Sequence, residues 1–310
     1  MVGLEFVISL VSDTQTTFWD VQMKNFKCQL NIVSRSSGAS VIQRSAYRCG
    51  QKLVDYETGV THNYAHRNDV SYSAMFAPKN SPTWAMYPEQ AWNQVNKVES
   101  RKNSRLAREL MISLPAAFNF EERVEVLDEI ALFLVDEYKV LVQVDQHDPK
   151  IFSAAEILKM KFQHAVPMPD APDFFHNQNF HAHILFSTRE LTAFGFGPKT
   201  RKLDGKKTGH HEVEKIRETV ASIINAKAQA LGIDLFMHAK SARRRGATTI
   251  PTMPLGQKGH WAAKRGLPNA TAELNERIKA YNEKPALTEA DFDEFLKQPG
   301  FSKPRPGMSM

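Results

Sequence analysis

The heptapeptide Phe-His-Ala-His-Ile-Leu-Phe at residues 180–186 places the strongest constraint on the fold. Apolar side chains stand at every second position, and His181 and His183 stand between them. Because side chains alternate across a β-strand, this pattern predicts a strand whose apolar face lies on a core. The two imidazoles then lie side by side on the opposite face.

A third imidazole, His147, follows a second strand-like run at residues 140–144. Three histidines can hold a divalent metal and leave positions open for water or a substrate oxygen. In the alternative interpretation, one or more of them are ordinary polar residues on a solvated sheet face. The histidine pattern alone leaves both interpretations open.

Positive charge is concentrated in one part of the chain. The 310 residues carry a formal charge of +6, and residues 197–266 hold 15 Lys and Arg against 5 Asp and Glu. Clustered positive charge favours a polyanionic partner, and nucleic acid is the main candidate. A basic surface that only aids solubility is the alternative.

Cysteine content and hydropathy exclude two classes of protein. The two cysteines, Cys28 and Cys49, are too few for a disulfide framework and are typical of a reducing cytosol. No stretch approaches the ~18 apolar residues that a membrane span needs. We therefore expect a cytoplasmic protein without membrane insertion.

The order of predicted elements favours an α+β fold with a central antiparallel sheet, helices packed on one face, and the His-x-His pair on a central strand. Residues 1–24 are expected to be a poorly ordered N-terminal extension, or to come from a start codon placed too early. Residues 25–266 are the expected main domain, and residues 267–310 are a short helical tail.

Local signals predict several helices. Asn119 followed by Glu122 is typical of a capping box and predicts a helix start. Apolar residues at helical spacing predict another helix over about residues 211–231. A further helix is expected to run through Ile42 and Leu53.

Cleavage of a DNA strand needs a nucleophile, and Tyr47 is a candidate within the segment Ser-Ala-Tyr-Arg-Cys-Gly. A tyrosine hydroxyl with a pKa of ~10 is a weak nucleophile unless a base or metal helps it to ionise. A phosphotyrosyl ester conserves the bond energy, so the strand can later be rejoined. Taken alone, Tyr47 is an ordinary helix residue, and the spacing does not exclude Tyr56, Tyr64 or Tyr72.

Several motifs occur together in an order that one known family shares. They are Ser-Arg-Ser-Ser-Gly at 34–38, Ala-Tyr-Arg at 46–48, Asp-Tyr at 55–56, Pro-Thr-Trp at 82–84, Trp-Asn at 92–93, Glu-Ser-Arg-Lys at 99–102, Ala-Arg-Glu at 107–109, Leu-Pro at 114–115, Asn-Phe-His-Ala-His-Ile-Leu at 179–185, Thr-Arg at 188–189 and Gly-Phe-Gly-Pro-Lys at 195–199. In this order they resemble the MobA/MobL family of plasmid mobilisation relaxases, a branch of the HUH endonucleases. The likeness extends from about residue 26 to residue 256.

The resemblance implies a metal-dependent, site-specific single-strand DNA endonuclease that nicks and rejoins plasmid DNA at a transfer origin. Tyr47 would attack the scissile phosphate and form a 5′-phosphotyrosyl adduct. His147, His181 and His183 would hold a divalent cation, Mg²⁺ or Mn²⁺, that polarises this phosphate. Glu109 would orient a ligand histidine or help to deprotonate Tyr47. A salt bridge to a neighbouring arginine is the alternative role for Glu109.

The chain departs from the family pattern in two places. Gln143 stands where the family usually has an aspartate, and Asp145 follows two residues later. The connection between His147 and the His-x-His strand is longer than usual and contains His164 and His176. His176 is therefore the chief competitor of His147 for the third ligand position.

Basic side chains are expected to grip DNA phosphates without choosing a sequence. They are Arg35, Arg48, Lys199, Arg201, Lys202, Arg243, Arg244 and Arg245. The resemblance also implies plasmid DNA, accessory mobilisation proteins and a coupling protein as partners. Two alternative functions stay open: a rolling-circle replication initiator with the same chemistry, and a non-catalytic DNA-binding or autoregulatory protein.

Overall fold

The computed structural model divides the chain into two compact units, residues 1–239 and residues 240–310. It describes residues 27–160, 165–168, 171–205, 207–240, 244, 249–250, 252–253, 255, 259, 261–262, 265–284 and 288–297. The predicted N-terminal extension, residues 1–24, lies outside the described residues. The predicted domain limits therefore stay predictions.

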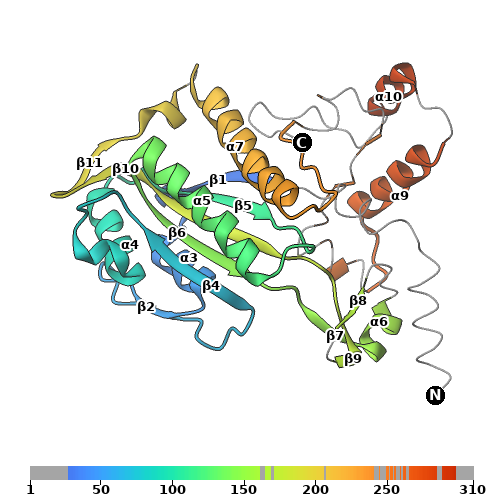
Figure 1. Cartoon of the computed structure of the whole chain (residues 1–310), viewed down its shortest axis with the longest axis horizontal. Coiled ribbons are helices and arrows are strands. Elements are labelled where there is room, and N and C mark those ends of the chain that lie inside the picture. Colours follow the sequence, from blue (N-terminus) through green and yellow to red (C-terminus); the bar gives the residue numbers. More distant parts are fainter. Residues whose placement is uncertain are drawn as a thin grey trace. The chain divides into compact units, whose positions relative to one another are not determined.

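A six-stranded antiparallel sheet forms the centre of the first unit (Figure 1). Its strands are β1 (Cys28–Ser34), β4 (Val70–Phe76), β5 (Arg105–Ser113), β6 (Val140–His147), β10 (His181–Thr192) and β11 (Gly195–Lys199). The strand order is β1-β5-β10-β6-β4, with β11 paired to β10. The predicted antiparallel sheet is confirmed, and the His-x-His strand is its central strand.

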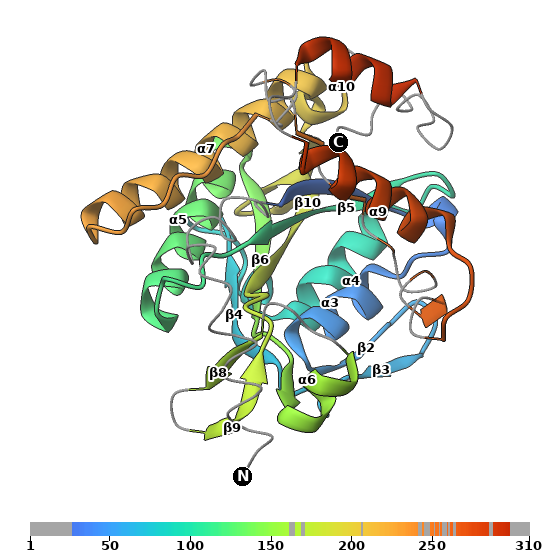
Figure 2. The same cartoon turned by 90° about the vertical axis from the view of Figure 1, so that its right-hand side faces the viewer.

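Helices cover both faces of this sheet (Figure 2). α5 (Phe120–Tyr138) and α7 (Gly209–Ala230) pack on one face, and α3 (Val41–Cys49) and α4 (Pro88–Val98) on the other. The α+β class is confirmed, but the prediction placed helices on one face only. The second layer forms because the middle strands bury apolar side chains on both sides: Ile184 joins the core under α5, and its neighbour Leu185 packs with Ile42 of α3.

The predicted start of α5 is confirmed in detail. The Asn119 side chain accepts a hydrogen bond from the Glu122 backbone N–H, and the Glu122 carboxylate accepts one from the Asn119 N–H. This reciprocal pair satisfies two of the donors that a helix N-terminus leaves unpaired. The predicted helix over about residues 211–231 is α7, with Ile216 and Val220 fully buried.

The α3 helix is shorter than predicted. Ser40 caps its N-terminus, and it ends at Gly50, so Leu53 lies in the next strand, β2 (Lys52–Val54), instead. Gly50 has φ +64°, and a Cβ there would lie 3.1 Å from Val70 Cγ2. Glycine allows this left-handed turn without strain, so the helix ends there. The chain continues into β2, which pairs with β3 (Thr61–Asn63).

The long connection after β6 has structure of its own (Figure 1). It forms β7 (Ile151–Ser153), α6 (Ala154–Met160), β8 (Val166–Met168) and β9 (Ala171–His176), which make a small sheet in the order β7-β9-β8. Phe152 and Phe175 bury a separate small core there. The sequence between the third histidine and the His-x-His strand is therefore a folded insertion.

Short 3-10 segments and two helices complete the described elements. The segments are η1 (Arg35–Ser37), η2 (Thr83–Met86) and η3 (Arg201–Asp204), and the helices are α9 (Ala270–Asn282) and α10 (Glu289–Leu296) of the second unit. Thr288 caps α10 and shares a capping box with Asp291. None of the helices that the structure describes combines the length and hydrophobicity needed to cross a membrane.

Candidate active site

Three histidines meet where β6 and β10 lie side by side. His181 pairs directly with His147 across the two strands, and His183 projects from the same face of β10. One ring nitrogen from each histidine lies within 4.8 Å of the others. The ring centroids of His147 lie 5.3 Å from His181 and 5.1 Å from His183. We call these three residues the histidine triad.

Oxygen acceptors orient each ring of the triad. The pairs are His147 Nε2 with the Arg48 carbonyl at 2.7 Å, His181 Nδ1 with the Asn179 carbonyl at 2.8 Å, and His183 Nδ1 with Glu109 Oε1 at 3.0 Å. Carbonyl and carboxylate oxygens only accept, so each of these nitrogens carries the proton. The other ring nitrogen keeps its lone pair, as in histidines that bind metals.

Burial keeps the triad neutral. It lowers the pKa of His147 to about 3 and the pKa of His183 to about 4, and it also lowers the pKa of His181. At neutral pH each ring therefore keeps one unprotonated nitrogen, and that of His147, Nδ1, lies 3.4 Å from Arg67 Nη2. Three neutral imidazoles fit a divalent cation and leave room for further oxygen ligands.

Glu109 lies behind the triad and is almost fully buried. Its carboxylate accepts from His183, from Arg48 Nε at 2.8 Å and from Arg44 Nη1 at 2.6 Å. Burial raises the pKa of Glu109, but the His183 hydrogen bond and the two arginine charges outweigh it and lower the pKa to about 2. An acid held this firmly as a carboxylate is a poor proton acceptor, so the geometry favours orientation of His183. Its arginine partners come from α3 rather than from its own strand.

Tyr47 stands on α3 at the edge of the triad. Its ring is 43% exposed, and the Arg67 guanidinium lies 4.1 Å from the ring centroid. Arg67 Nη1 also donates to the Tyr47 carbonyl at 2.6 Å, while Arg67 Nη2 lies 3.4 Å from His147 Nδ1. One guanidinium therefore contacts both the candidate nucleophile and the triad.

The three alternative tyrosines have different surroundings. Tyr56 donates its hydroxyl to Glu89 near α4, and Tyr72 donates to Asp128 of α5, on the far face of the sheet from the triad. Tyr64 packs edge-on against Tyr47, with 5.2 Å between ring centroids. The structure thus groups Tyr47 and Tyr64 near the triad.

The triad contains His147 and not His176. His176 lies in β9, where its Nδ1 accepts from the Gln178 backbone N–H and its ring lies 5.9 Å from Phe180. His164 lies outside the described residues. Among the described residues, His147 is therefore the histidine that lies close to His181 and His183.

The polar residues that depart from the family pattern form a buried network. Gln143 accepts from the Ser45 hydroxyl at 2.7 Å and from the Trp92 indole, and it donates to Asp145 at 2.8 Å. Burial raises the pKa of Asp145 to about 7, against hydrogen bonds from Ser73 and Gln143. The network ties α3 and α4 to the strand that carries His147.

Four of the eight basic residues predicted to bind DNA form the following contacts with protein groups. Arg35 bonds to Glu57, Asn96 and the Glu99 carbonyl. The other pairs are Arg48 with Glu109, Lys199 with Glu99 at 2.8 Å, and Lys202 with Glu137 at 3.4 Å.

Two of the remaining basic candidates are exposed. Arg201 is exposed in η3, and Arg244 is exposed in the second unit. Arg243 and Arg245 lie outside the described residues. DNA binding by these eight residues stays a prediction.

Two arginines of the site were missed in the sequence. Arg44 precedes Arg48 by one helical turn, so the sequence itself indicated that both arginines lie on the same face of α3. Arg67 had no such signal, because it meets His147 only through a contact between residues 80 positions apart.

Comparisons with known proteins agree with this arrangement. Residues 39–265 match the model of the MobA/MobL family. The Mobilization protein MobL of Acidithiobacillus ferridurans is 30% identical over 250 residues, which cover 79% of this chain and 64% of that protein. The Probable conjugal transfer protein TraA of Sinorhizobium fredii is 25% identical over 285 residues, which cover 83% of this chain and 23% of that protein.

A solved structure shares the fold. The structure "Molecular Basis of Vancomycin Resistance Transfer in Staphylococcus aureus" has a TM-score of 0.55 at 24% identity, over 70% of this chain and 98% of that chain. The present chain spans less than two thirds of the length of MobL and about a quarter of TraA. Because the family model covers well over half of its residues, the chain belongs to the MobA/MobL family.

Proposed function

We propose that the chain is a DNA relaxase, which nicks one strand of plasmid DNA at a transfer origin and later rejoins it. Relatives named for mobilization and conjugal transfer support this function. The observation that carries the proposal is the single Arg67 guanidinium in contact with both Tyr47 and His147. A half-exposed candidate nucleophile and a largely buried cluster of metal-ligand type are thereby linked through one side chain.

The reaction is a transesterification. The Tyr47 phenolic oxygen forms a bond to the scissile phosphorus, and the bond from phosphorus to the 3′ oxygen breaks. The phenol loses its proton and the departing 3′ oxygen gains one, so the products are a 5′-phosphotyrosyl ester and a free 3′-hydroxyl. Phosphodiester bonds are conserved in number, and the reverse reaction reseals the strand.

The protein groups position the reactants. His147, His181 and His183 would hold Mg²⁺ or Mn²⁺, and the bound cation would withdraw negative charge from the scissile phosphate. Glu109 keeps the His183 ring turned so that its lone pair faces the site. Arg67 holds the Tyr47 ring and backbone beside the triad.

Exposed basic residues would grip the DNA backbone. Arg201 and Lys202 follow β11 and are exposed, so phosphates can reach them. Such contacts give affinity and salt dependence without sequence choice. Plasmid DNA is the partner that this chemistry needs, with accessory mobilisation proteins and a coupling protein as the further partners that conjugative transfer implies.

A covalent-adduct assay tests the proposal. Supercoiled plasmid that carries the cognate transfer origin is incubated with the protein and Mg²⁺ or Mn²⁺, then treated with protease or left untreated before electrophoresis. We expect nicked plasmid with protein joined to the 5′ end. Tyr47→Phe should form no adduct and still bind the DNA.

Matched variants and substrates separate the alternatives. Tyr64→Phe removes the neighbouring hydroxyl and should leave the adduct intact; an adduct lost only in Tyr64→Phe would move the nucleophile to Tyr64. Nicking without any covalent bond would make the protein a water-dependent nuclease. An adduct on a replication origin, but not on a transfer origin, would favour a replication initiator.

A further inference from the structure

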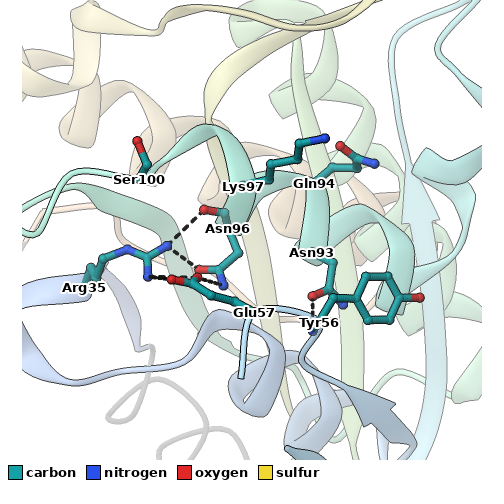
Figure 3. Close-up of a pocket in the computed structure, with 8 residues that line it drawn as sticks. All are labelled: Arg35, Tyr56, Glu57, Asn93, Gln94, Asn96, Lys97 and Ser100. Atoms are coloured by element: carbon teal, nitrogen blue, oxygen red, sulfur yellow. Dashed lines mark hydrogen bonds and ion pairs between the residues drawn. The ribbon is translucent and has the colours of Figure 1, made fainter. Parts of the chain in front are cut away.

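A pocket of about 400 Å³ lies beside α4 (Figure 3), and no residue of the histidine triad lines it. Its wall is built from segments that are distant in sequence: Arg35 after β1, the loop after β2, and α4 with its C-terminal end. Pockets of this size commonly hold small ligands or single groups of larger ones. None of the chemistry proposed for Tyr47 uses it.

Tyr56 presents a fixed aromatic ring at this pocket. Its backbone N–H donates to Asn93 Oδ1 at 2.8 Å, and its hydroxyl donates to Glu89 Oε1 at 2.8 Å. The ring is therefore held at both ends, yet it remains 60% exposed. A preorganised and exposed π-face is suited to stacking on a flat ligand, because little conformational entropy is lost on binding.

The floor of the pocket is a closed hydrogen-bond network. The Arg35 guanidinium donates to both Glu57 carboxylate oxygens and to the backbone and side-chain oxygens of Asn96. Asn96 Nδ2 donates in turn to Glu57 Oε2 at 2.6 Å. Arg35 thus has no donor left for a phosphate, and its role here is to hold Glu57 and Asn96 in place.

The rim of the pocket carries polar groups that remain available. Among the described residues that line the pocket, the side chains of Gln94, Lys97 and Ser100 have no hydrogen-bond or ion-pair partner. Gln94 offers an amide that can both donate and accept, and Lys97 offers a positive charge. A flat ring, an amide and a cation are the groups that bind a base, its edge and its phosphate.

We infer that this pocket binds one unpaired nucleotide of the DNA strand, with the base stacked on Tyr56 and its edge facing Gln94. This inference rests on the proposed function, because it takes single-stranded DNA as the ligand. The Arg35 backbone N–H bonds to the Ser104 carbonyl, five residues before Glu109 on the same strand segment. At about 3.4 Å per residue, Ser104 and Glu109 lie roughly 17 Å apart along the chain, a distance that an extended DNA strand can span.

Binding of single-stranded DNA without cleavage tests the pocket. The probe is a fluorescein-labelled pool of random-sequence single-stranded DNA, measured by anisotropy in EDTA. Tyr56→Ala should weaken binding about tenfold, which is the loss expected for one stacked base. Tyr56→Phe keeps the ring and should bind within about twofold of the wild type.

Two controls make the result specific. Tyr87 is similarly exposed, at 54%, and does not line the pocket, so Tyr87→Ala should bind like the wild type. Affinity for the same pool as duplex should not change in Tyr56→Ala, because paired bases are not free to stack. Unchanged single-strand binding by Tyr56→Ala, or equal losses on single strand and duplex, would overturn the inference.

Sequencing of the bound fraction tests the base edge. Gln94→Ala should lose a base preference that the wild type shows at one position of the selected strands. The same base preference in both proteins would show that Gln94 does not recognise the base. Because these assays need no cleavage, a protein that binds as expected and forms no tyrosyl adduct would refute the relaxase proposal alone.

Discussion

The guanidinium of Arg67 lies between Tyr47 and His147. It stands 4.1 Å from the centre of the Tyr47 ring, and its Nη2 lies 3.4 Å from His147 Nδ1. Asp69 pairs with both Nε and Nη2 of Arg67 and fixes its orientation. Three residues far from one another in sequence are thus held in one arrangement by a single side chain.

Arg67→Ala should slow formation of the tyrosyl adduct about tenfold, which corresponds to about 1.4 kcal/mol of barrier. The variant loses the contact over the Tyr47 ring and the hydrogen bond to its backbone, so nucleophile and triad are no longer held together. Single-turnover cleavage at saturating DNA measures the rate. Arg67→Lys should recover the rate only in part, because an ammonium restores the charge without the planar fork. A wild-type rate in Arg67→Ala would contradict this role.

His181→Ala should bind Mn²⁺ at least tenfold more weakly than the wild type, because one of three imidazoles is removed. Isothermal titration of the protein without DNA measures this affinity and needs no activity. His176→Ala is the matched control, since His176 lies outside the triad and should leave Mn²⁺ binding unchanged. Weaker Mn²⁺ binding by His176→Ala would place His176 among the ligands, and unchanged binding by His181→Ala would remove His181 from them.

Glu109→Gln should lower the free energy of unfolding by about 3 kcal/mol, because it leaves Arg44 and Arg48 beside a neutral amide in a buried site. Urea denaturation at neutral pH measures the loss. Glu57→Gln is the control: the Glu57 side chain is 55% exposed, so loss of its ion pair with Arg35 should cost at most about 1 kcal/mol. Equal decreases in the free energy of unfolding of both variants would contradict the view that burial makes the Glu109 ion pairs more important for stability.

Stability of the metal-free protein should fall as the pH drops from about 6.5 toward 4. The pKa of His183 is about 4 in the folded protein, against 6.5 for a free histidine side chain, so the unfolded chain binds a proton first. The stabilisation is present above pH 6.5 and is lost as the pH falls, by about 3 kcal/mol for this residue alone. Urea denaturation in EDTA across this range measures the slope.

His183→Gln should flatten this dependence, because the substituted side chain does not titrate. His147 keeps a part of the slope in that variant, since its pKa is also lowered, to about 3, while Asp145, whose pKa is raised to about 7, contributes a slope of opposite sign in both proteins. An identical slope in the wild type and in His183→Gln would show that His183 is not held neutral by burial.

Much of the local structure could be predicted from short-range signals. The reciprocal hydrogen bonds of Asn119 and Glu122 involve residues three positions apart, so the start of α5 is visible in the sequence. The extent of α3 was not predicted correctly. A helical pattern through Leu53 ignored Gly50, which ends the helix in a left-handed turn where a Cβ would crowd Val70.

The sequence by itself determined the strand with two adjacent imidazoles, because the alternation of side chains is a local property of a β-strand. Tertiary structure alone decided which third histidine joins them, that Glu109 pairs with arginines from α3, and that Arg67 reaches both Tyr47 and His147. These contacts depend on strand register and on a helix packed against the second face of the sheet. Neither is set by residues close together in the chain, since each arises only when distant segments bury their apolar sides together.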